Sequence, residues 1–281
     1  MKRRTFIRST LLGVAGVPLL AAEGLAEPNR FEVTRTRLVN NKLSRTLRIV
    51  QVTDMHLTYR GNDDSIPGLV NSLEPDLVLF TGDYVDHGTG TPPDMQRFRS
   101  FIHEFDSTTP MFAIFGNWDR GYEGRLFKRT LVRSVRNRRE SVVIDGNTVS
   151  ITGMDYYHPD MQLLQTAVNG ADLSCVLYHS PDMVVFAEPT GYYDLMLAGH
   201  THGGQVRLPF LRLLQDGHGS FPWPGAIITG TYTGTRYQSG LYRLQNMDLY
   251  VSRGLGETDG IPFRFLCRPE LAVIEIGPEG T

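Results

Sequence analysis

The sequence contains very little cysteine and none of the patterns that mark repeat or cross-linked proteins. Its only two cysteines, Cys175 and Cys267, are too few and too far apart for a disulfide framework. Cys175 lies within the apolar run LSCVLY, so we expect buried thiols rather than a bridge. After residue 30 there is no internal repeat, low-complexity tract or Pro/Ser linker, and no GxSxG motif supports a serine-type hydrolase.

An excess of charge of one sign is also lacking. The 281 residues include 28 Lys and Arg and 30 Asp and Glu, which gives a net charge of −2. A globally basic nucleic-acid-binding protein is therefore not expected. With 41% hydrophobic and 21% charged residues, the chain favours a folded protein with a large core over disorder.

No hydrophobic run is long enough to span a membrane. The N-terminal apolar run from Leu11 to Ala22 falls short of the roughly 20 residues that a bilayer requires. Basic residues precede it, and small residues follow it, which predicts a secretory signal over residues 1–26, with cleavage after Ala26 or Ala22. The motif RRTFIR resembles a twin-arginine signal, so we expect export by that machinery to the periplasm or cell envelope. An uncleaved anchor helix is the alternative.

Short apolar runs recur along the rest of the chain and end at turn residues. Such runs predict buried strands, and the segments between several of them read as helices. The expected strands are 47–53, 77–81, 111–115, 149–153, 173–178 and 193–199, and the expected helices lie near 66–73, 94–105, 160–168 and 181–187. This alternation predicts an α/β fold. Strand-like segments end the chain, and we expect a lead-in over 27–44 and one domain over 45–277.

Polar residues gather where five of the predicted strands end. Because ligands bind beyond the carboxyl ends of strands in α/β sheets, these side chains are expected to converge. They are Asp54 and His56, Asp83 and Asp86, Asn117 and Asp119, His179, and His200 with His202.

The residue types and their spacing predict a metal centre. In extended chain, residues i and i+2 point the same way, so Asp54 and His56 could face one ion, as could His200 and His202. Mixed carboxylate, imidazole and amide ligands suit Mn, Fe or Zn better than Ca. Four histidines with two carboxylates exceed one four-coordinate zinc, which favours two divalent ions that share a carboxylate.

The ordered motifs carry a family resemblance. Asp54-x-His56, Gly82-Asp83-x-x-Asp86, Gly116-Asn117-x-Asp119, His179 and Gly199-His200-x-His202 together resemble the calcineurin-like metallophosphoesterase superfamily. The N-terminal signal and the ending YVSRGLGETDGIPFRFLCRPELAVIEI are similar to its exported YkuE-like branch, which is related to UDP-2,3-diacylglucosamine hydrolases of lipid A synthesis.

The resemblance implies a fold, a metal centre and a reaction. The fold would be a four-layer sandwich of two mixed β-sheets flanked by helices. By position, one ion would take Asp54, His56, Asp83 and His202, and the other Asp83, Asn117, His179 and His200, with Asp86 and Asp119 supporting them. A hydroxide that bridges the two ions would hydrolyse a phosphodiester or pyrophosphate bond without a protein nucleophile.

One residue departs from the family pattern. Trp118 occupies the position that holds His in many of these enzymes, where the His acts near the leaving group. An indole N–H can donate a hydrogen bond but cannot transfer a proton at neutral pH. We therefore expect a preference for phosphoanhydrides or activated phosphodiesters, with a UDP-2,3-diacylglucosamine-type lipid as candidate substrate.

Three alternatives stay open at the level of sequence. The loss of the His could leave a non-catalytic metal-binding envelope protein, and the enzyme could instead be a general exported phosphomonoesterase or phosphodiesterase. The segment 206–225, rich in Phe, Leu and Trp, is either a loop packed on its own core or a peripheral membrane contact.

Overall fold

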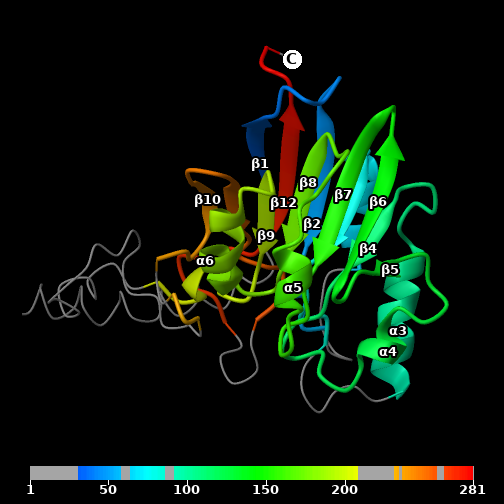
Figure 1. Ribbon diagram of the computed structural model, residues 1–281. Coiled ribbons are helices and arrows are strands. Elements are labelled where there is room, and N and C mark those ends of the chain that lie inside the picture. Colours follow the sequence, from blue (N-terminus) through cyan, green and yellow to red (C-terminus); the bar gives the residue numbers. More distant parts are fainter. Residues whose placement is uncertain are drawn as a thin grey trace, which may run out of the picture.

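Two β-sheets packed face to face form the body of the molecule (Figure 1). The structure is a computed structural model that describes residues 31–57, 64–85, 92–207, 231–233, 236–257 and 263–280. The predicted signal segment, Asp86 and nearly all of the segment 206–225 lie outside these ranges.

The first sheet joins the two ends of the described chain. Its strands run in the order β1 (Glu32–Val39), β12 (Glu270–Gly277), β2 (Leu47–Val52), β3 (Leu77–Phe80), β4 (Met111–Ala113) and β5 (Arg133–Ser134). β12 pairs in parallel with β1 and antiparallel with β2, and the strands from β2 to β5 are parallel. The sheet is therefore mixed, with the last strand inserted between the first two.

The second sheet is also mixed. Its order is β10 (Gly240–Arg243), β11 (Asp248–Val251), β9 (Leu195–Ala198), β8 (Leu173–Leu177), β7 (Asn147–Gly153) and β6 (Arg138–Ile144). The inner pairs are parallel, and antiparallel pairs stand at both edges. In Figure 1, β12 and its parallel partner β1 run upward, whereas β2 to β5 and the parallel strands of the second sheet end on the lower side.

The apolar runs of the sequence are explained by burial on both faces of each sheet. In β3, Leu77 and Leu79 belong to the core between the sheets, whereas Val78 and Phe80 belong to the core under the helices of the first sheet. Successive strand residues point to opposite faces, so a strand that is covered on both sides must be apolar throughout.

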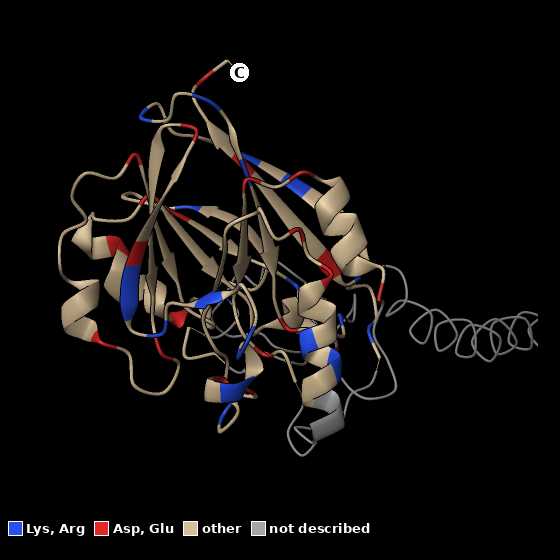
Figure 2. Ribbon diagram, turned by 90° about the vertical axis from the view of Figure 1, so that its right-hand side faces the viewer, with Lys and Arg blue, Asp and Glu red and all other residues tan. Residues whose placement is uncertain are grey.

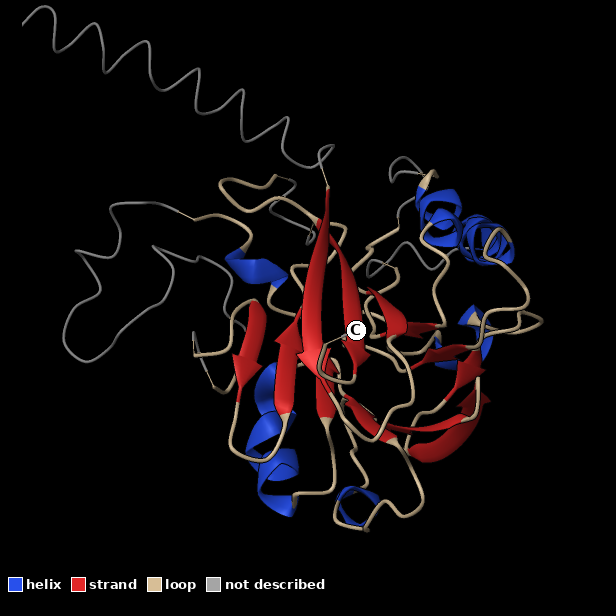
Figure 3. Cartoon of the chain, turned by 90° about the horizontal axis from the view of Figure 1, so that it is seen from above, coloured by secondary structure: helices blue, strands red, loops and turns tan. Residues whose placement is uncertain are grey.

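Helices cover the outer faces of both sheets (Figure 3). On the first sheet these are α2 (Ile66–Ser72), α3 (Pro92–His103) and α4 (Glu123–Leu126). On the second they are α5 (Met161–Leu164) and α6 (Val184–Ala187), with the 3₁₀ turns η2 (Pro181–Met183) and η3 (Glu188–Thr190) beside α6. The predicted single-domain, four-layer α/β sandwich is confirmed.

Some elements differ from those expected from the sequence. The predicted helix over 160–168 is the single turn α5, and the predicted segment 181–187 divides into η2 and α6. The strands β1, β5 and β6 and the helix α4 were not predicted. Because β1 pairs with β12, residues 32–39 belong to the first sheet; the division into 1–26, 27–44 and 45–277 stays a prediction.

Two further expectations can be compared with the structure. Both cysteines are buried and neither forms a disulfide, as predicted. Within the described ranges, no helix combines the length and apolar character that a membrane crossing requires.

Candidate metal centre

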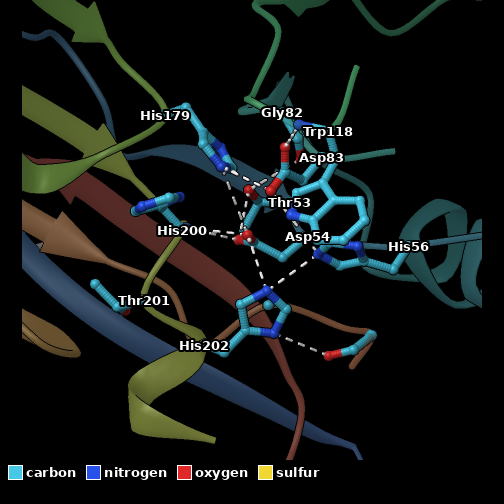
Figure 4. A network of polar contacts seen from close by, with 12 residues as sticks. Thr53, Asp54, His56, Gly82, Asp83, Trp118, His179, His200, Thr201 and His202 are labelled. Atoms are coloured by element: carbon cyan, nitrogen blue, oxygen red, sulfur yellow. Dashed lines mark hydrogen bonds and ion pairs between the residues drawn. The ribbon is translucent and has the colours of Figure 1, made fainter. Parts of the chain in front are cut away.

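The polar side chains predicted at the strand ends meet between the two sheets. β2, β3 and β4 deliver the residues that follow them from the first sheet, and β8 and β9 deliver theirs from the second (Figure 4). Two groups result, each with one carboxylate and two imidazoles whose ligand atoms lie within 4.8 Å of one another. They are Asp54, His56 and His202 in the first group, and Asp83, His179 and His200 in the second.

In the first group, the ring nitrogens of both histidines face the same point. His56 Nε2 lies 3.1 Å from His202 Nε2, and the latter lies 3.4 Å from Asp54 Oδ1. His202 Nδ1 lies 3.2 Å from the carbonyl oxygen of Gly256, which can only accept a hydrogen bond. The proton is therefore placed on Nδ1, which leaves the Nε2 lone pair free for an ion.

The second group repeats this arrangement. His179 Nδ1 donates to the carbonyl of Thr81 at 2.7 Å, and its Nε2 lies 3.0 Å from Asp83 Oδ2. The same Asp83 oxygen lies 3.8 Å from His56 Nε2 of the first group. Asp83 thus stands between the two groups, in the position that a shared carboxylate needs.

The side-chain amide of Asn117 is a further candidate metal ligand. Its Oδ1 atom is buried and has no hydrogen-bond partner among the described residues. A buried polar atom without a partner costs free energy, and such atoms in native structures commonly face an ion or water. An amide oxygen beside a carboxylate and imidazoles fits the donor set of a transition-metal ion.

The backbone at these residues is unusual. Asp54, His56, Asp83, His200 and His202 all have φ between +43° and +71°. Non-glycine residues rarely adopt this left-handed region, and such strain clusters at functional sites. The local chain is therefore held by its surroundings in the geometry that the side chains need.

The positive φ angles explain why one prediction from the i, i+2 spacing of residues is wrong. We expected residues i and i+2 to face one ion, and Asp54 and His56 do lie in one group. His200 and His202, however, lie in different groups. The chain is not extended there, because both residues have positive φ and His202 begins the 3₁₀ turn η4 (His202–Gly204).

Two glycines permit the close approach of neighbouring strand ends. A Cβ atom at Gly116 would collide with the carboxylate of Asp83, and one at Gly199 would collide with the carboxylate of Asp54. Glycine is therefore required at both positions. The backbone amide of His200, next to Gly199, donates to both oxygens of Asp54 at 3.0 and 3.1 Å.

Burial and mutual charge shift the pKa values of the group members. For Asp83, burial acts upward, but the charge on His179 and its hydrogen bond outweigh burial and lower the pKa to about 2. For His179, burial acts downward, but Asp83 raises the pKa to about 9. Without an ion, a proton on His179 thus compensates the Asp83 charge, and a divalent cation would supply the same compensation.

Asp119 and Trp118 flank the centre in different ways. Asp119 is fully buried and accepts hydrogen bonds from three backbone amides, those of Asp83, Tyr84 and Gly116, each at 2.8 Å. Trp118 is half-buried, and its backbone amide donates to Asp83 at 2.8 Å. Its indole meets the ring of His56 edge-on, with centroids 5.5 Å apart (Figure 4).

Two residues near the centre were not identified from the sequence. Arg264 is fully buried and donates to the carbonyl oxygens of His202, Gly256 and Arg253. The ring of Tyr156 lies 5.6 Å from those of both His179 and His200. Neither belongs to a family motif, although Arg264 lies in the ending PFRFLCRPE that carries part of the resemblance.

Comparison with known proteins supports the same assignment. Residues 47–204 match the family model for calcineurin-like phosphoesterases. The chain is 30% identical to the uncharacterized metallophosphoesterase YkuE of Bacillus subtilis, with 98% of each chain covered. It is 28% identical to the phosphodiesterase YaeI of Escherichia coli, over 98% of this chain and 99% of YaeI. It is 26% identical to the UDP-2,3-diacylglucosamine pyrophosphatase LpxG of Chlamydia trachomatis, over 88% and 90%.

The matched residues contain every described side chain of the two ligand groups. Calcineurin-like phosphoesterases use two divalent metals, and the two groups around Asp83 are compatible with such a centre. The chain therefore belongs to the calcineurin-like phosphoesterase family and is a dinuclear-metal phosphohydrolase.

Proposed function

We propose that this enzyme hydrolyses a phosphodiester or pyrophosphate bond whose leaving group needs little protonation. The observation that carries the proposal is Trp118, which lies against His56 at the edge of the metal centre. The chain retains the two ligand groups while offering an indole where many family members have an imidazole.

We assign seven residues as metal ligands. Asp54, His56 and His202 would hold one ion, His179, His200 and Asn117 the other, and Asp83 would contribute to both. Two such ions supply charge to the phosphoryl oxygens and lower the pKa of a water molecule. The orphaned Asn117 Oδ1 atom and the convergent Nε2 atoms of His56 and His202 support this assignment. Asp119 would act by holding the backbone of Asp83, and Asp86 lies outside the described residues.

The aromatic side chains beside the metal centre do not supply a general acid, which favours substrates with a good leaving group. A general acid contributes roughly 10²–10⁴-fold to a rate, and Trp118 cannot provide that proton transfer. Tyr156, the other aromatic residue beside the centre, has its pKa raised to about 12 by burial and by Asp83, so it holds its proton at neutral pH. A phosphate leaving group is a weaker base than an alkoxide and loses least without a general acid.

A UDP-2,3-diacylglucosamine-type lipid is the candidate substrate. It has the pyrophosphate bond that this argument favours, and the similarity to LpxG over most of both chains supports it. A second candidate is a simpler phosphodiester, which the similarity to YaeI supports. The name of each relative describes that relative, so both substrates need a direct test.

The test is a substrate panel run with added Mn, Fe, Zn or Mg. It includes bis-p-nitrophenyl phosphate, a phosphomonoester, a UDP-sugar and the UDP-linked diacyl lipid. We expect the pyrophosphates and the aryl diester to be turned over and the alkyl phosphomonoester to react least. A panel led by the monoester would contradict the leaving-group proposal.

Two variants separate the enzyme from a non-catalytic metal-binding protein. Asp83→Asn should abolish turnover and reduce the metal bound per chain, whereas Asp106→Asn, on the exposed surface, should change neither. Metal content is measured by elemental analysis independently of activity. Full metal loading without turnover of any substrate would favour the non-catalytic alternative, and chelator-resistant turnover would favour a serine-type hydrolase.

We also propose that the enzyme is exported through residues 1–26. The paired arginines Arg3 and Arg4 and the apolar run after them support this proposal. Replacing both arginines with lysine should retain the protein in the cytoplasmic fraction. The contact of segment 206–225 with the membrane remains a proposal that deletion of its apolar residues would test.

A further inference from the structure

Positive charge is concentrated in one segment of an otherwise acidic chain. Residues 120–139 contain eight of the 28 Lys and Arg residues and only one of the 30 Asp and Glu residues, Glu123. The segment therefore carries a net charge of +7 within a chain whose total is −2. Neither the metal centre nor the proposed reaction uses these cations.

The fold displays these cations on one side of the molecule. The segment contains α4, β5 and the start of β6, which lie together at the right of Figure 1, and Figure 2 turns that side toward the viewer. Seven of the eight side chains are exposed; they are Arg120, Arg125, Lys128, Arg129, Arg133, Arg136 and Arg138. We call these seven residues the basic surface.

Several of these cations have no carboxylate partner among the described residues. Arg133 pairs with Glu140 at 3.0 Å, and Arg136 pairs with Asp155. Within the described part of the chain, Lys128, Arg129 and Arg138 form no ion pair. A surface cation that no carboxylate neutralises leaves its charge available to an anionic partner.

The basic surface contains a hollow of about 390 Å³ that apolar and charged side chains line together. Phe115, Phe127 and Val132 contribute the apolar part, and all three are buried. Lys128, Arg136 and Arg138 line the same hollow together with one carboxylate, that of Glu123, so cations outnumber anions there. A cavity of this size with apolar walls and a few charged groups suits one amphiphilic headgroup.

An exposed leucine stands next to the unpaired cations. Leu131 is 59% exposed, two residues after Arg129 and immediately before the buried Val132. Arg129 itself has φ +65°, a conformation that glycine would adopt at lower cost. An apolar side chain beside several cations is the composition that inserts at an anionic membrane interface.

We propose that the basic surface docks the enzyme on a lipid bilayer that contains anionic lipids. The cations would contact phosphate headgroups, the hollow would hold one of them, and Leu131 would enter the acyl boundary. A nucleic acid would use the charge but would have no use for the apolar hollow or for Leu131. Charge complementarity together with these two apolar features therefore favours a bilayer.

The basic surface begins at the rim of the metal centre. The guanidinium of Arg120 lies 4.7 Å above the ring of Tyr157, whose hydroxyl donates to the carbonyl of Asn117 at 3.1 Å. A bilayer in contact with this surface would lie beside the proposed active site. Docking does not depend on the proposed reaction, because soluble diesters can be hydrolysed with or without it.

Vesicle flotation with the full chain in its metal-loaded form tests the proposal. The probes are phosphatidylcholine vesicles with and without about 30 mol % phosphatidylglycerol, at low and high salt. We expect binding to the anionic vesicles only, and weaker binding in high salt. The double variant Lys128→Glu/Arg129→Glu should weaken partitioning by about 10- to 100-fold, while hydrolysis of bis-p-nitrophenyl phosphate is unchanged.

A matched control carries the same change in charge elsewhere. Arg37 on β1 and Arg243 on β10 are exposed and lie outside the basic surface, so Arg37→Glu/Arg243→Glu should retain most of the binding. Equal losses in the two double variants would overturn the proposal, because net charge alone would then explain the result. Absence of binding to anionic vesicles would overturn it as well.

Leu131→Ser distinguishes a bilayer from a soluble polyanion. This variant keeps every cation, and we expect it to weaken vesicle binding by about fivefold while leaving binding to heparin unchanged. Equal vesicle binding by the variant and the parent, with tight heparin binding by both, would replace the bilayer with a polyanionic partner.

Discussion

The carboxylate of Asp119 holds the backbone of Asp83. Its Oδ2 atom accepts the amide hydrogen of Asp83 at 2.8 Å, and its Oδ1 atom accepts that of the next residue, Tyr84, at the same distance. Asp119 therefore fixes the strained turn from which Asp83 reaches between the two ligand groups. Asp119 thus sets the position of the central carboxylate without belonging to either ligand group.

Replacing Asp119 with alanine should destabilise the protein and weaken the metal centre. Three buried amide hydrogens would lose their acceptor, at a cost of about 1–3 kcal/mol each. Denaturant unfolding should show a loss of about 3 kcal/mol or more, and elemental analysis should show less metal per chain. Asp106→Ala removes only exposed hydrogen bonds from Thr108, so this control should lose less than about 1 kcal/mol and keep its metal.

Arg264 is expected to position His202 rather than to touch substrate. It donates to the Gly256 carbonyl, which also accepts from His202 Nδ1. Loss of such an outer partner typically costs 10- to 100-fold in metal affinity. Arg264→Met should therefore release one of the two ions at lower chelator concentration, and Arg264→Lys should partly restore it.

A neighbouring residue provides the comparison for Arg264. The thiol of Cys267 contacts the His202 carbonyl at 3.3 Å but does not reach the ring. Cys267→Ala should keep both ions. If Arg264→Met retains two ions with unchanged affinity, or loses both together with the fold, the positioning role is wrong.

Trp118→His should change which substrates react. Restoring an imidazole would supply a general acid, so we expect turnover of diesters with poor leaving groups to rise by about tenfold or more. Turnover of a UDP-sugar pyrophosphate should change much less. Trp118→Phe keeps an aromatic ring against His56 without a proton to transfer and should show no such gain. An unchanged ratio of the two activities in Trp118→His would refute the leaving-group argument.

Glu270 should make stability depend on acid pH. Burial raises its pKa, but Arg253 and hydrogen bonds from Thr34, Tyr250 and the Arg253 amide outweigh burial and lower the pKa below the ordinary 4.5. A carboxyl whose pKa is lower in the folded state stabilises the fold above pH 4.5 and loses that contribution as the pH falls through the folded value.

The variant Glu270→Gln tests this dependence. It breaks a buried ion pair with Arg253 at 3.0 Å, and such losses cost about 3–5 kcal/mol. Unfolding measured between about pH 7 and pH 3 should show a flatter acid limb in the variant. Glu275→Gln, which removes partly exposed pairs with Arg35 and Arg48, should cost less than about 1 kcal/mol. Parallel curves for Glu270→Gln and the parent protein would contradict the assignment.

The strands that could be predicted from the sequence are those whose two faces both contact a hydrophobic core. β3 and β9 are apolar throughout, and β2 and β8 mostly so, because helices cover one face and the other sheet covers the second. β1 escaped prediction because EVTRTRLV lies at the edge of its sheet and alternates exposed and partly buried residues. Its partner β12 lies more than 230 residues away, and no local pattern signals that pairing.

The metal ligands could be predicted from the sequence because their residue types and their order along the chain form motifs. The six residues of the two ligand groups were all identified from motifs. Their division between the groups could not follow from spacing, because the left-handed backbone at His200 and His202 turns the two rings apart. Arg264 was missed because it acts through carbonyl oxygens, which every residue has, on a histidine 62 positions away.

The insertion of β12 between β1 and β2 has a consequence for the order of folding. As the ribosome makes the chain, β1 emerges first but has no neighbour in its sheet until residues 270–277 are complete. The metal ligands of both sheets are all synthesised before that strand. The first sheet therefore closes last, and a chain shortened by its final strand would leave β1 detached and one edge of β2 open.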